Sequence, residues 1–133
     1  MADTGIGTGL QVELVAADRT VWSGEGSMVI ARTVDGDVGV LRGHAPLLSV
    51  LTEAEVEITS PDGVVHAVVD GGFISVAGDR VSILTEHALL AEEIKINEVE
   101  AELETANGLS AGEERERRIR RAEARVRAYR KAS

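Results

Sequence analysis

The sequence predicts a β-domain over residues 10–87, either a sandwich or a barrel, followed by a helical hairpin over residues 88–133. Two observations carry this prediction. From Leu10 to Thr85, β-branched runs alternate with turn residues at a spacing of about 8–12 residues, which is typical of antiparallel β-folds. Beyond Glu86 the apolar residues recur in steps of three and four, which is the period of an amphipathic helix. A parallel sheet would need helical crossovers, and the first segment has no helical period.

The composition is that of a globular domain with an aliphatic core. Of the 133 residues, 44% are hydrophobic and 28% are charged, while only 2% are aromatic. Val, Ile, Leu and Ala must therefore build the core. Cysteine is absent, which excludes disulfides and thiolate chemistry. No apolar stretch approaches the about 18 residues that span a bilayer, and no signal peptide is visible. We therefore expect a cytoplasmic chain without direct membrane insertion.

The first nine residues are small, polar and glycine-rich, and we expect residues 1–9 to form a flexible N-terminus. The spacing of Gly5, Gly7 and Gly9 is similar to part of a nucleotide-binding fingerprint. That motif joins a strand to a helix, whereas these glycines precede a strand. We expect no nucleotide site here.

Alternating apolar and polar residues, separated by Gly, Pro and Asp turns, predict the strands. The densest pattern lies in residues 36–48, where two apolar runs flank a turn that Gly43 and Pro46 are suited to hold. This stretch contains no nucleophile or phosphate-binding loop and is more typical of a surface that a partner contacts. The other runs assigned to strands are residues 10–16, 28–31, 55–59, 64–69, 73–76 and 81–84.

Two helices with matching apolar seams follow, and a short connection predicts that they pack antiparallel. Asn107 and Gly108 stop the first helix, and a capping box from Ser110 to Glu113 opens the second. Each seam holds only about two large residues, so we expect the hairpin to be marginal alone and to pack on the β-domain or on a partner. The seams are Ile96, Val99, Leu103 and Ala106 in the first helix and Ile119, Ala122, Val126 and Tyr129 in the second.

The charge is distributed unevenly along the chain. The formal net charge is −9, yet residues 106–133 carry nine basic and four acidic side chains, and residues 86–105 carry one and seven. The overall charge repels phosphate and no aromatic residues lie between the arginines, so nucleic acid is not an expected partner. A solvated helix face is the common reason for such a run. The alternatives are a helix that docks on an acidic protein surface, or part of a nucleotide-phosphate site.

Candidate catalytic and metal-binding residues are not supported by spacing. His44, His66 and His87 lie far apart without a local ligand pattern. Asp35 and Asp37 are similar to the start of a calcium loop, but the later ligands are missing. We expect no catalytic residues, no metal and no cofactor. From its residues alone, the chain is a noncatalytic β-domain that carries a helical hairpin.

Several motifs, taken in order, resemble the epsilon subunit of bacterial F-type ATP synthases. The resemblance extends over about residues 10–131 and rests on five segments. These are Leu10-Gln11-Val12-Glu13-Leu14-Val15, Trp22-Ser23-Gly24, Gly36-x-x-Gly39-x-Leu41-x-x-His44-Ala45-Pro46-Leu47-Leu48, Asp70-Gly71-Gly72-Phe73-Ile74-Ser75-Val76 and Val81-Ser82-Ile83-Leu84-Thr85.

The resemblance implies a β-sandwich of about ten strands and an antiparallel two-helix unit in a noncatalytic subunit of the rotating central stalk. Such a subunit couples proton flow to ATP synthesis, regulates ATP hydrolysis and lies peripherally at the cytoplasmic face of the cell membrane. The implied partners are the gamma subunit, the c-ring and the alpha/beta catalytic head. The implied contacts are Asp35, Gly36 and Asp37 toward the c-ring, and His44, Pro46 and Ser49 toward gamma.

Regulation would lie in the basic second helix, with Arg118, Arg121 and Arg125 as candidates. In the regulatory hypothesis the hairpin is either folded against the sandwich or extended toward the catalytic head, where the basic helix binds acidic surfaces.

Two positions depart from the family pattern. Arg42 stands where the family usually has proline before the Gly-His pair, which removes some rigidity and adds a charge that would alter contacts with gamma. Some relatives bind ATP through a motif on the first helix, and here Lys95 replaces its Asp and Glu98 its Arg. A carboxylate that faces phosphates is unfavourable, so we expect weak or no ATP binding. The alternative function is an ATP-sensing module whose hairpin closes on nucleotide.

Overall fold

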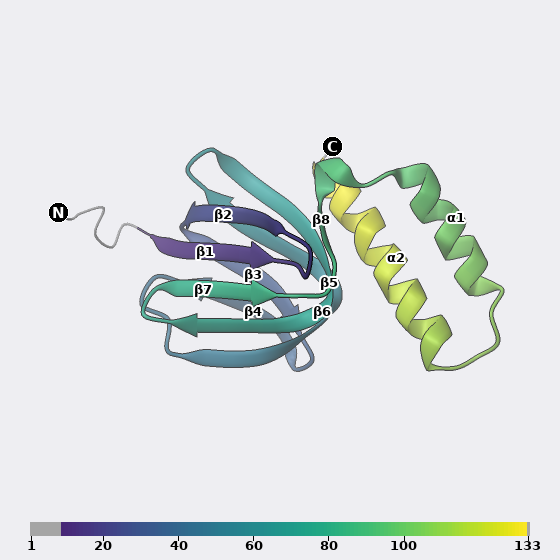
Figure 1. Cartoon of the computed structure of the whole chain (residues 1–133), viewed down its shortest axis with the longest axis horizontal. Helices are drawn as coiled ribbons and strands as arrows, with labels where there is room; N and C mark the ends of the chain where they lie inside the picture. Colours follow the sequence, from purple (N-terminus) through teal and green to yellow (C-terminus); the bar gives the residue numbers. More distant parts are fainter. Residues whose placement is uncertain (1–8, 133) are drawn as a thin grey trace.

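A computed structural model describes residues 9–132 and contains a curled sheet with a helical hairpin against one end (Figure 1). Apart from Gly9, the expected N-terminal segment 1–9 lies outside the described residues. The strands are β1 (Leu10–Val15), β2 (Thr20–Gly26), β3 (Met28–Thr33), β4 (Gly36–Leu41), β5 (Leu47–Ser60), β6 (Gly63–Ala77), β7 (Arg80–Leu84) and β8 (Ala88–Leu90).

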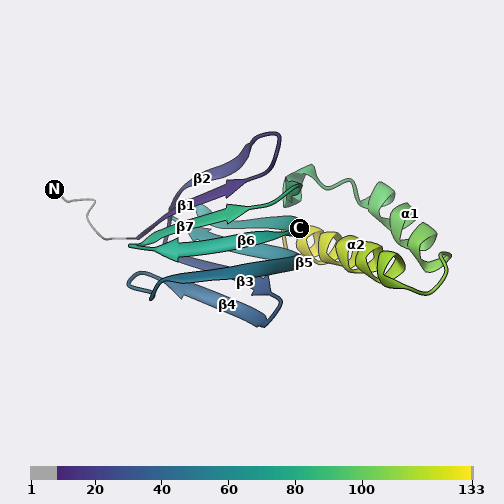
Figure 2. The same cartoon turned by 60° about the horizontal axis from the view of Figure 1, so that its bottom comes forward.

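The strands form one continuous sheet in the order β2-β1-β7-β6-β5-β3-β4, with β8 paired to β6. β1 and β7 run parallel, and the other pairs are antiparallel. The sheet curls over itself so that two layers enclose the core (Figure 2). The sandwich is therefore confirmed. It contains eight strands, close to the about ten expected. β5 and β6 are long strands that pair with each other along nearly their whole length, and β6 pairs with β8 near its middle and with β7 near its end.

Alternation along the strands fills the space between the layers. Leu10, Val12 and Leu14 of β1 are fully buried, and the residues between them face outward. Val81 and Ile83 of β7 continue the same layer. Aliphatic side chains thus form the core, as the scarcity of aromatic residues predicts.

The Gly71–Gly72 pair explains why the Asp-Gly-Gly-Phe segment has this composition. Both glycines have positive φ, 88° and 112°, a region that residues with a Cβ avoid. At Gly72 a Cβ would overlap the carbonyl oxygen of Leu84 on the neighbouring β7. Glycine thus permits the close approach of the two strands where β6 changes its neighbours.

The hairpin consists of α1 (Ile96–Asn107) and α2 (Glu113–Ala132), preceded by a 3-10 turn, η1 (Ala91–Glu93). Both helices and the tight connection agree with the apolar spacing. Residues 88–90, which the predicted boundary places in the hairpin, pair with β6 as β8. The predicted capping box is wrong, because α2 begins at Glu113 and its first turn closes on the carbonyl of Gly112, leaving Ser110 outside the helix.

Within residues 9–132, neither helix combines the length and apolarity needed to cross a bilayer. In the same range, no three His, Asp or Glu side chains gather in a way that could hold a metal ion.

Candidate functional site

α2 lies between α1 and the outer surface of the sheet (Figures 1 and 2). Ala122 faces α1, as the seam pattern predicts, and is buried. Ala124 and Ala128 form a second buried line on the same helix, packed in a cluster with Val68 of β6. Small side chains allow the helix to approach the strands closely, so the hairpin is docked on the sandwich in this structure.

A row of three glutamates lines the part of β5 that α2 covers. Glu53, Glu55 and Glu57 alternate with the buried Ala54 and Val56. Because successive strand side chains point to opposite faces, all three carboxylates lie on the outer face. We call these three residues the acidic row.

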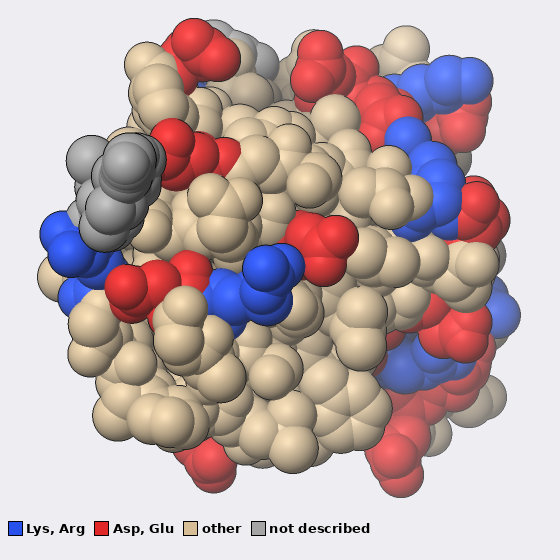
Figure 3. All heavy atoms as spheres, turned by 60° about the vertical axis from the view of Figure 1, so that its left-hand side comes forward, with Lys and Arg blue, Asp and Glu red and all other residues tan. Residues whose placement is uncertain are grey.

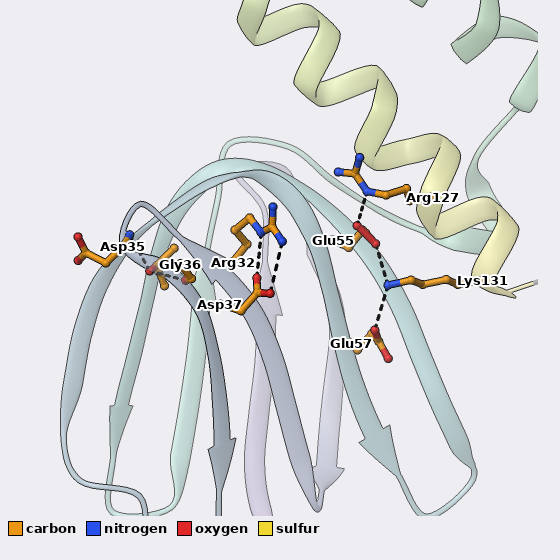
Figure 4. Close-up of polar contacts among 9 residues, drawn as sticks. Arg32, Asp35, Gly36, Asp37, Glu55, Glu57, Arg127 and Lys131 are labelled. Carbon is orange, nitrogen blue, oxygen red and sulfur yellow. Dashed lines mark hydrogen bonds and ion pairs between the residues drawn. The ribbon is translucent and has the colours of Figure 1, made fainter.

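α2 carries a matching line of cations. Arg120, Arg127 and Lys131 are separated by seven and four residues, steps that keep side chains on one face of a helix. Figure 4 shows the C-terminal part of this line, Arg127 and Lys131, against Glu55 and Glu57 of the acidic row. The contacts are Arg120 Nε to Glu53 Oε1 at 3.0 Å, Arg127 Nε to Glu55 Oε1 at 2.7 Å, and Lys131 Nζ to Glu55 Oε2 at 3.1 Å and to Glu57 Oε2 at 3.4 Å.

A more buried ion pair lies deeper in the same interface. Arg125 Nη2 lies 3.3 Å from Asp70 Oδ2 of β6, and the two side chains are only 13% and 12% exposed. The other arm of Arg125, Nη1, lies 3.8 Å from Glu102 of α1. Arg125 therefore joins both helices to the sheet. We call the ion pairs of the acidic row together with Asp70–Arg125 the latch.

The two carboxyl groups at the centre of the latch respond differently to their surroundings. Burial raises the pKa of Asp70, and the nearby Arg125 and Arg121 offset this only in part. At Glu55 burial also acts to raise the pKa, but hydrogen bonds from Arg127 and Lys131 outweigh it and lower the pKa below its ordinary value. The ionised Glu55 is thus matched to the docked helix, whereas the ionised Asp70 bears a desolvation cost.

The three arginines proposed for the regulatory helix do not form one free basic surface. Arg125 belongs to the latch, and Arg118 Nε pairs with Glu114 within α2 at 2.7 Å. Arg118 and Arg121 also line a cleft of about 210 Å³ between the helices, with Glu102 and Thr105 of α1 on the opposite side. The cleft is thus shared by cations and a carboxylate.

The degenerate nucleotide positions lie at the exposed start of α1. Lys95 Nζ lies 3.9 Å from Glu98 Oε2, and both side chains are largely exposed. Neither residue lines the cleft between the helices. The structure therefore keeps these two side chains apart from the arginines of α2.

The turn between β3 and β4 contains the three residues expected to face a ring. Thr33 Oγ1 donates to the Gly36 carbonyl and accepts from the Asp35 N–H, and Gly36 has φ 116°. The Asp35 side chain points away from the sheet (Figure 4). Asp37, in contrast, lies opposite Arg32 in the ladder and accepts from its Nε at 2.9 Å and its Nη2 at 3.3 Å. Of the two carboxylates in this turn, Asp37 is therefore engaged by Arg32, whereas Asp35 is exposed and points to solvent.

The loop at the other end of β4 is held by Asp79. Gly43, with φ 84°, donates its N–H to Asp79 Oδ1 at 2.6 Å, and Arg42 Nε lies 3.9 Å from the other carboxylate oxygen. Arg42 thus supplies an electrostatic tether where the family has proline. His44 Nδ1 lies 2.6 Å from the Ala45 carbonyl. Of the other residues expected to contact gamma, Pro46 is exposed and Ser49 is half-buried.

Next to this loop, four large apolar side chains are exposed on three adjacent strands. Val50 of β5 pairs with Phe73 of β6, and Phe73 pairs with Leu84 of β7. Charged side chains are sparse on much of the sandwich surface in Figure 3. An exposed cluster of this kind marks an interaction site more often than scattered single residues do. We call it the apolar face; its members are Leu48, which is 73% exposed, Val50, Phe73 and Leu84.

Sequence reasoning missed the latch and the apolar face. The signal for the latch was present, since Glu53, Glu55 and Glu57 alternate in a strand while cations recur on one side of the second helix. What the sequence could not supply is the direction in which the hairpin folds back.

Comparison with known proteins agrees with this architecture. Residues 9–91 match the model of the family described as ATP synthase, Delta/Epsilon chain, beta-sandwich domain. The ATP synthase epsilon chain of Streptomyces griseus is 57% identical over 98 residues, which cover 73% of this chain and 79% of the relative. The epsilon chain of Thermobifida fusca is 46% identical over 124 residues, which cover 90% of each.

Solved structures extend the likeness to the helices. A chain of the Euglena gracilis mitochondrial ATP synthase, in an assembly of OSCP, F1 and c-ring, superposes with a TM-score of 0.81 at 26% identity. The match covers 96% of this chain and 86% of that one. A chain from the central stalk and c-ring of the Tetrahymena thermophila enzyme shares the fold at a TM-score of 0.65 and 16% identity. This chain belongs to the family of ATP synthase epsilon chains.

Proposed function

We propose that this chain is a noncatalytic rotor subunit of the central stalk, which couples proton flow to ATP synthesis in a proton-translocating F-type ATP synthase. Membership of the epsilon family supports the proposal, as does the likeness to a chain solved within an F1 and c-ring assembly. In this role the chain lies peripherally at the cytoplasmic face of the cell membrane. It contributes contacts and no reacting group.

The sandwich binds the gamma subunit through the apolar face and the adjoining loop. The exposure of Leu48 and Phe73 is the observation that carries this assignment, because burying them against a partner removes apolar surface from water at about 25 cal/mol per Å². His44 and Pro46 lie in the adjoining loop and complete the contact. Ser49 lies between Leu48 and Val50 and pairs with the buried Ile74, so its side chain is on the inner side of β5 and supports the face from behind. The hydrogen bond from the Gly43 N–H to Asp79 holds this loop in place, and Arg42 lies near the same carboxylate.

The c-ring contacts the turn of Asp35, Gly36 and Asp37. The exposed carboxylate of Asp35 is free to accept from polar or basic groups on the loops of the ring. The bidentate pair of Asp37 with Arg32 stiffens the turn. Torque then passes from the ring through a rigid β-hairpin into the sandwich.

The hairpin regulates ATP hydrolysis by moving between two positions. Docked, α2 holds the acidic row of the sandwich; extended, the same cations of α2 bind acidic surfaces of the alpha/beta catalytic head. The latch supports this proposal because the cation of each outer pair is half-exposed, so water competes for it, and ion pairs open to solvent contribute about 1 kcal/mol or less each. A partner that offers equivalent carboxylates can therefore compete for the helix.

Co-purification with gamma and the c-ring tests the assignment. Charge substitutions in the apolar face, Leu48→Glu or Phe73→Glu, are expected to abolish capture of gamma because they bury a carboxylate in the contact. Val64→Glu is the matched control, since Val64 is 50% exposed on the remote end of β6. If the face variants capture gamma as well as the control does, the proposed gamma surface is wrong. If the unsubstituted chain captures neither partner, the central-stalk assignment fails.

A second candidate function, ATP sensing by the hairpin, rests on the cleft beside Arg118 and Arg121. The cleft of about 210 Å³ is smaller than the about 300 Å³ at which ligand pockets begin, and Glu102 lines it. Titration of the full chain with ATP by calorimetry separates the two functions. We expect no binding at millimolar ATP; binding there would favour the sensing role.

A further inference from the structure

The predicted ring-facing turn and the end of the hairpin share one polar groove. Arg32 and Asp37 of the turn's β-hairpin line it on one side, and Lys131 of α2 lines it on the other. Glu55 and Glu57 of the acidic row lie between them. Figure 4 shows these side chains converging from β3, β4, β5 and the last turn of α2. Two ion-pair systems from opposite functional regions therefore meet in a cleft of about 160 Å³.

Arg32 reaches this groove because the sheet is irregular beside it. Ala31 pairs with Val56, but Thr33 pairs with Leu51, so Arg32 stands opposite a β5 segment with three extra residues. Such bulges redirect side chains. Arg32 is held by Asp37, and Glu55 adds a weaker attraction to the same guanidinium.

The remaining charges of the groove follow the same arrangement. Lys131 is held by Glu55 and Glu57, while Asp37 attracts it from further away. Arg127 donates to the second oxygen of Glu55. Arg32 and Lys131 are thus each held by one or two carboxylates and attracted by a more distant one that another cation occupies.

We propose that Arg32 is an exchangeable cation, which passes from Asp37 to Glu55 when a ring group occupies Asp37 and thereby loosens the end of the docked hairpin. This inference rests on the proposed ring contact of the turn. A basic group that binds Asp37 releases the guanidinium, and Glu55 in the same groove is the other carboxylate that attracts it. Arg32 then competes with Arg127 and Lys131 for that carboxylate. Contact with the ring and docking of α2 therefore oppose each other.

The exchange is tested by the position of the hairpin in the full chain. Because the sequence has no cysteine, Asp62→Cys and Glu104→Cys, both exposed, provide one dye site on the sandwich and one on α1. Energy transfer between the dyes reports the docked fraction. Asp37→Asn imitates an occupied Asp37, and it is expected to lower the ratio of docked to released hairpin about two- to fivefold, the range for an exposed pair.

Rescue distinguishes exchange from damage to the turn. The double variant Arg32→Gln, Asp37→Asn removes the freed cation and is expected to restore the docked ratio, and Arg32→Gln alone is expected to keep the hairpin docked. Asp35→Asn is the matched control, because this carboxylate lies in the same turn but outside the groove. If Asp37→Asn releases the hairpin and the double variant does not restore it, exchange by Arg32 is wrong.

Glu55→Gln separates this inference from the proposed latch. Release by Glu55→Gln together with normal docking of Asp37→Asn would overturn the exchange and leave the latch intact. Normal docking of both variants would overturn the latch as well. Neither result bears on the gamma and ring contacts, which co-purification tests independently.

Discussion

At the scale of single residues, the latch contains two kinds of ion pair. Arg125 and Asp70 are shielded from solvent, whereas Arg120 is half-exposed opposite Glu53. Removing one partner of a buried pair leaves an uncompensated charge, which costs far more than loss of a solvated pair. The deep pair therefore decides whether the hairpin docks, and the outer pairs adjust how firmly it does so.

Arg125→Ala is accordingly expected to weaken docking by about 3 kcal/mol, because the carboxylate of Asp70 stays behind without a partner. Arg120→Ala is the matched comparison, and it is expected to cost about 0.5 kcal/mol. Energy transfer between sandwich and hairpin, followed in increasing urea, measures both. Equal losses of docking free energy for the two variants would show that the buried Asp70–Arg125 pair contributes no more than an outer pair.

Glu55 predicts how docking responds to acid. Its pKa is lower in the docked state, so its stabilisation is present above the ordinary glutamate pKa of 4.5 and is lost as the pH falls through the docked pKa. Asp70 acts in the opposite direction, since its pKa is raised and protonation relieves its desolvation cost. We expect the docked fraction to fall below about pH 4.5, and to fall less in Glu55→Gln.

The control for the acid response is Glu100→Gln, an exposed position of α1 away from the latch. Circular dichroism of each sample distinguishes release of the hairpin from unfolding of the sandwich. An identical acid response in Glu55→Gln and in the unsubstituted chain would contradict the role given to Glu55.

At the scale of elements, α2 has two buried lines where the seam predicts one. Ala122 continues the seam toward α1, and Ala124 and Ala128 face the sheet. Because alanine has no atoms beyond Cβ, the backbone of α2 can lie near β5 and β6, which brings the long cations within reach of the acidic row. The ion pairs of the latch therefore depend on the alanines, which let α2 lie close enough to the strands for the pairs to form.

Ala128→Leu is expected to weaken docking by about 1–3 kcal/mol, since the added atoms overpack the contact with the strands. The lost approach would also lengthen the pairs of Arg127 and Lys131. Ala101→Leu is the control, an exposed position on α1 where leucine is compatible with the helix. Unfolding of the hairpin unit in urea measures the difference; docking of the Ala128→Leu variant at full strength would mean that the sheet is not the packing partner.

The periodicity of the sequence predicts where most of the strands and both helices lie, but it does not predict how the hairpin packs on the sheet. Alternation located most of the strands, and steps of three and four located α1 and α2. The sequence does not show that Ala124 and Ala128 face the sheet, because alanine occurs on solvent-exposed helix faces as well as on buried ones. Residues 88–90 were not separated from the helical region, since a three-residue edge strand has too little pattern to detect.

The candidate contacts depended on the resemblance rather than on periodicity. No spacing rule links the turn of Asp35 to a ring or the loop of His44 to gamma. The structure adds what lies around them: Arg32 beside Asp37, Asp79 beneath the loop, and the apolar face next to it. These are contacts between segments distant in sequence, which a single sequence does not reveal.

At the scale of the whole molecule, a rigid sandwich carries a hairpin that is held mainly by one helix. The sandwich extends through η1, because β8 pairs with β6 and Arg19 binds Glu93 at 2.7 Å. α1 is linked to the sheet by way of α2. In particular, Arg125 of α2 pairs both with Glu102 of α1 and with Asp70 of β6. Release of α2 therefore frees the whole hairpin without disturbing the surfaces proposed for gamma and the ring.

This division permits a clean deletion of the hairpin. Truncation after Lys95 keeps β8, η1 and the Arg19–Glu93 pair, and removes both helices. The newly exposed surface is the contact of α2, including Val68. The apolar face and the turn of Asp35 stay as they are, so assembly with gamma and the ring is expected to proceed.

The most direct test of the account is the rate of ATP hydrolysis by the assembled synthase that carries the truncated chain, compared with the same enzyme that carries the full chain. Assembly is verified in both by the stoichiometry of gamma and the ring. We expect faster hydrolysis with the truncated chain, because the cations of α2 are no longer present to bind the catalytic head. An unchanged rate in an intact assembly would contradict regulation by the hairpin.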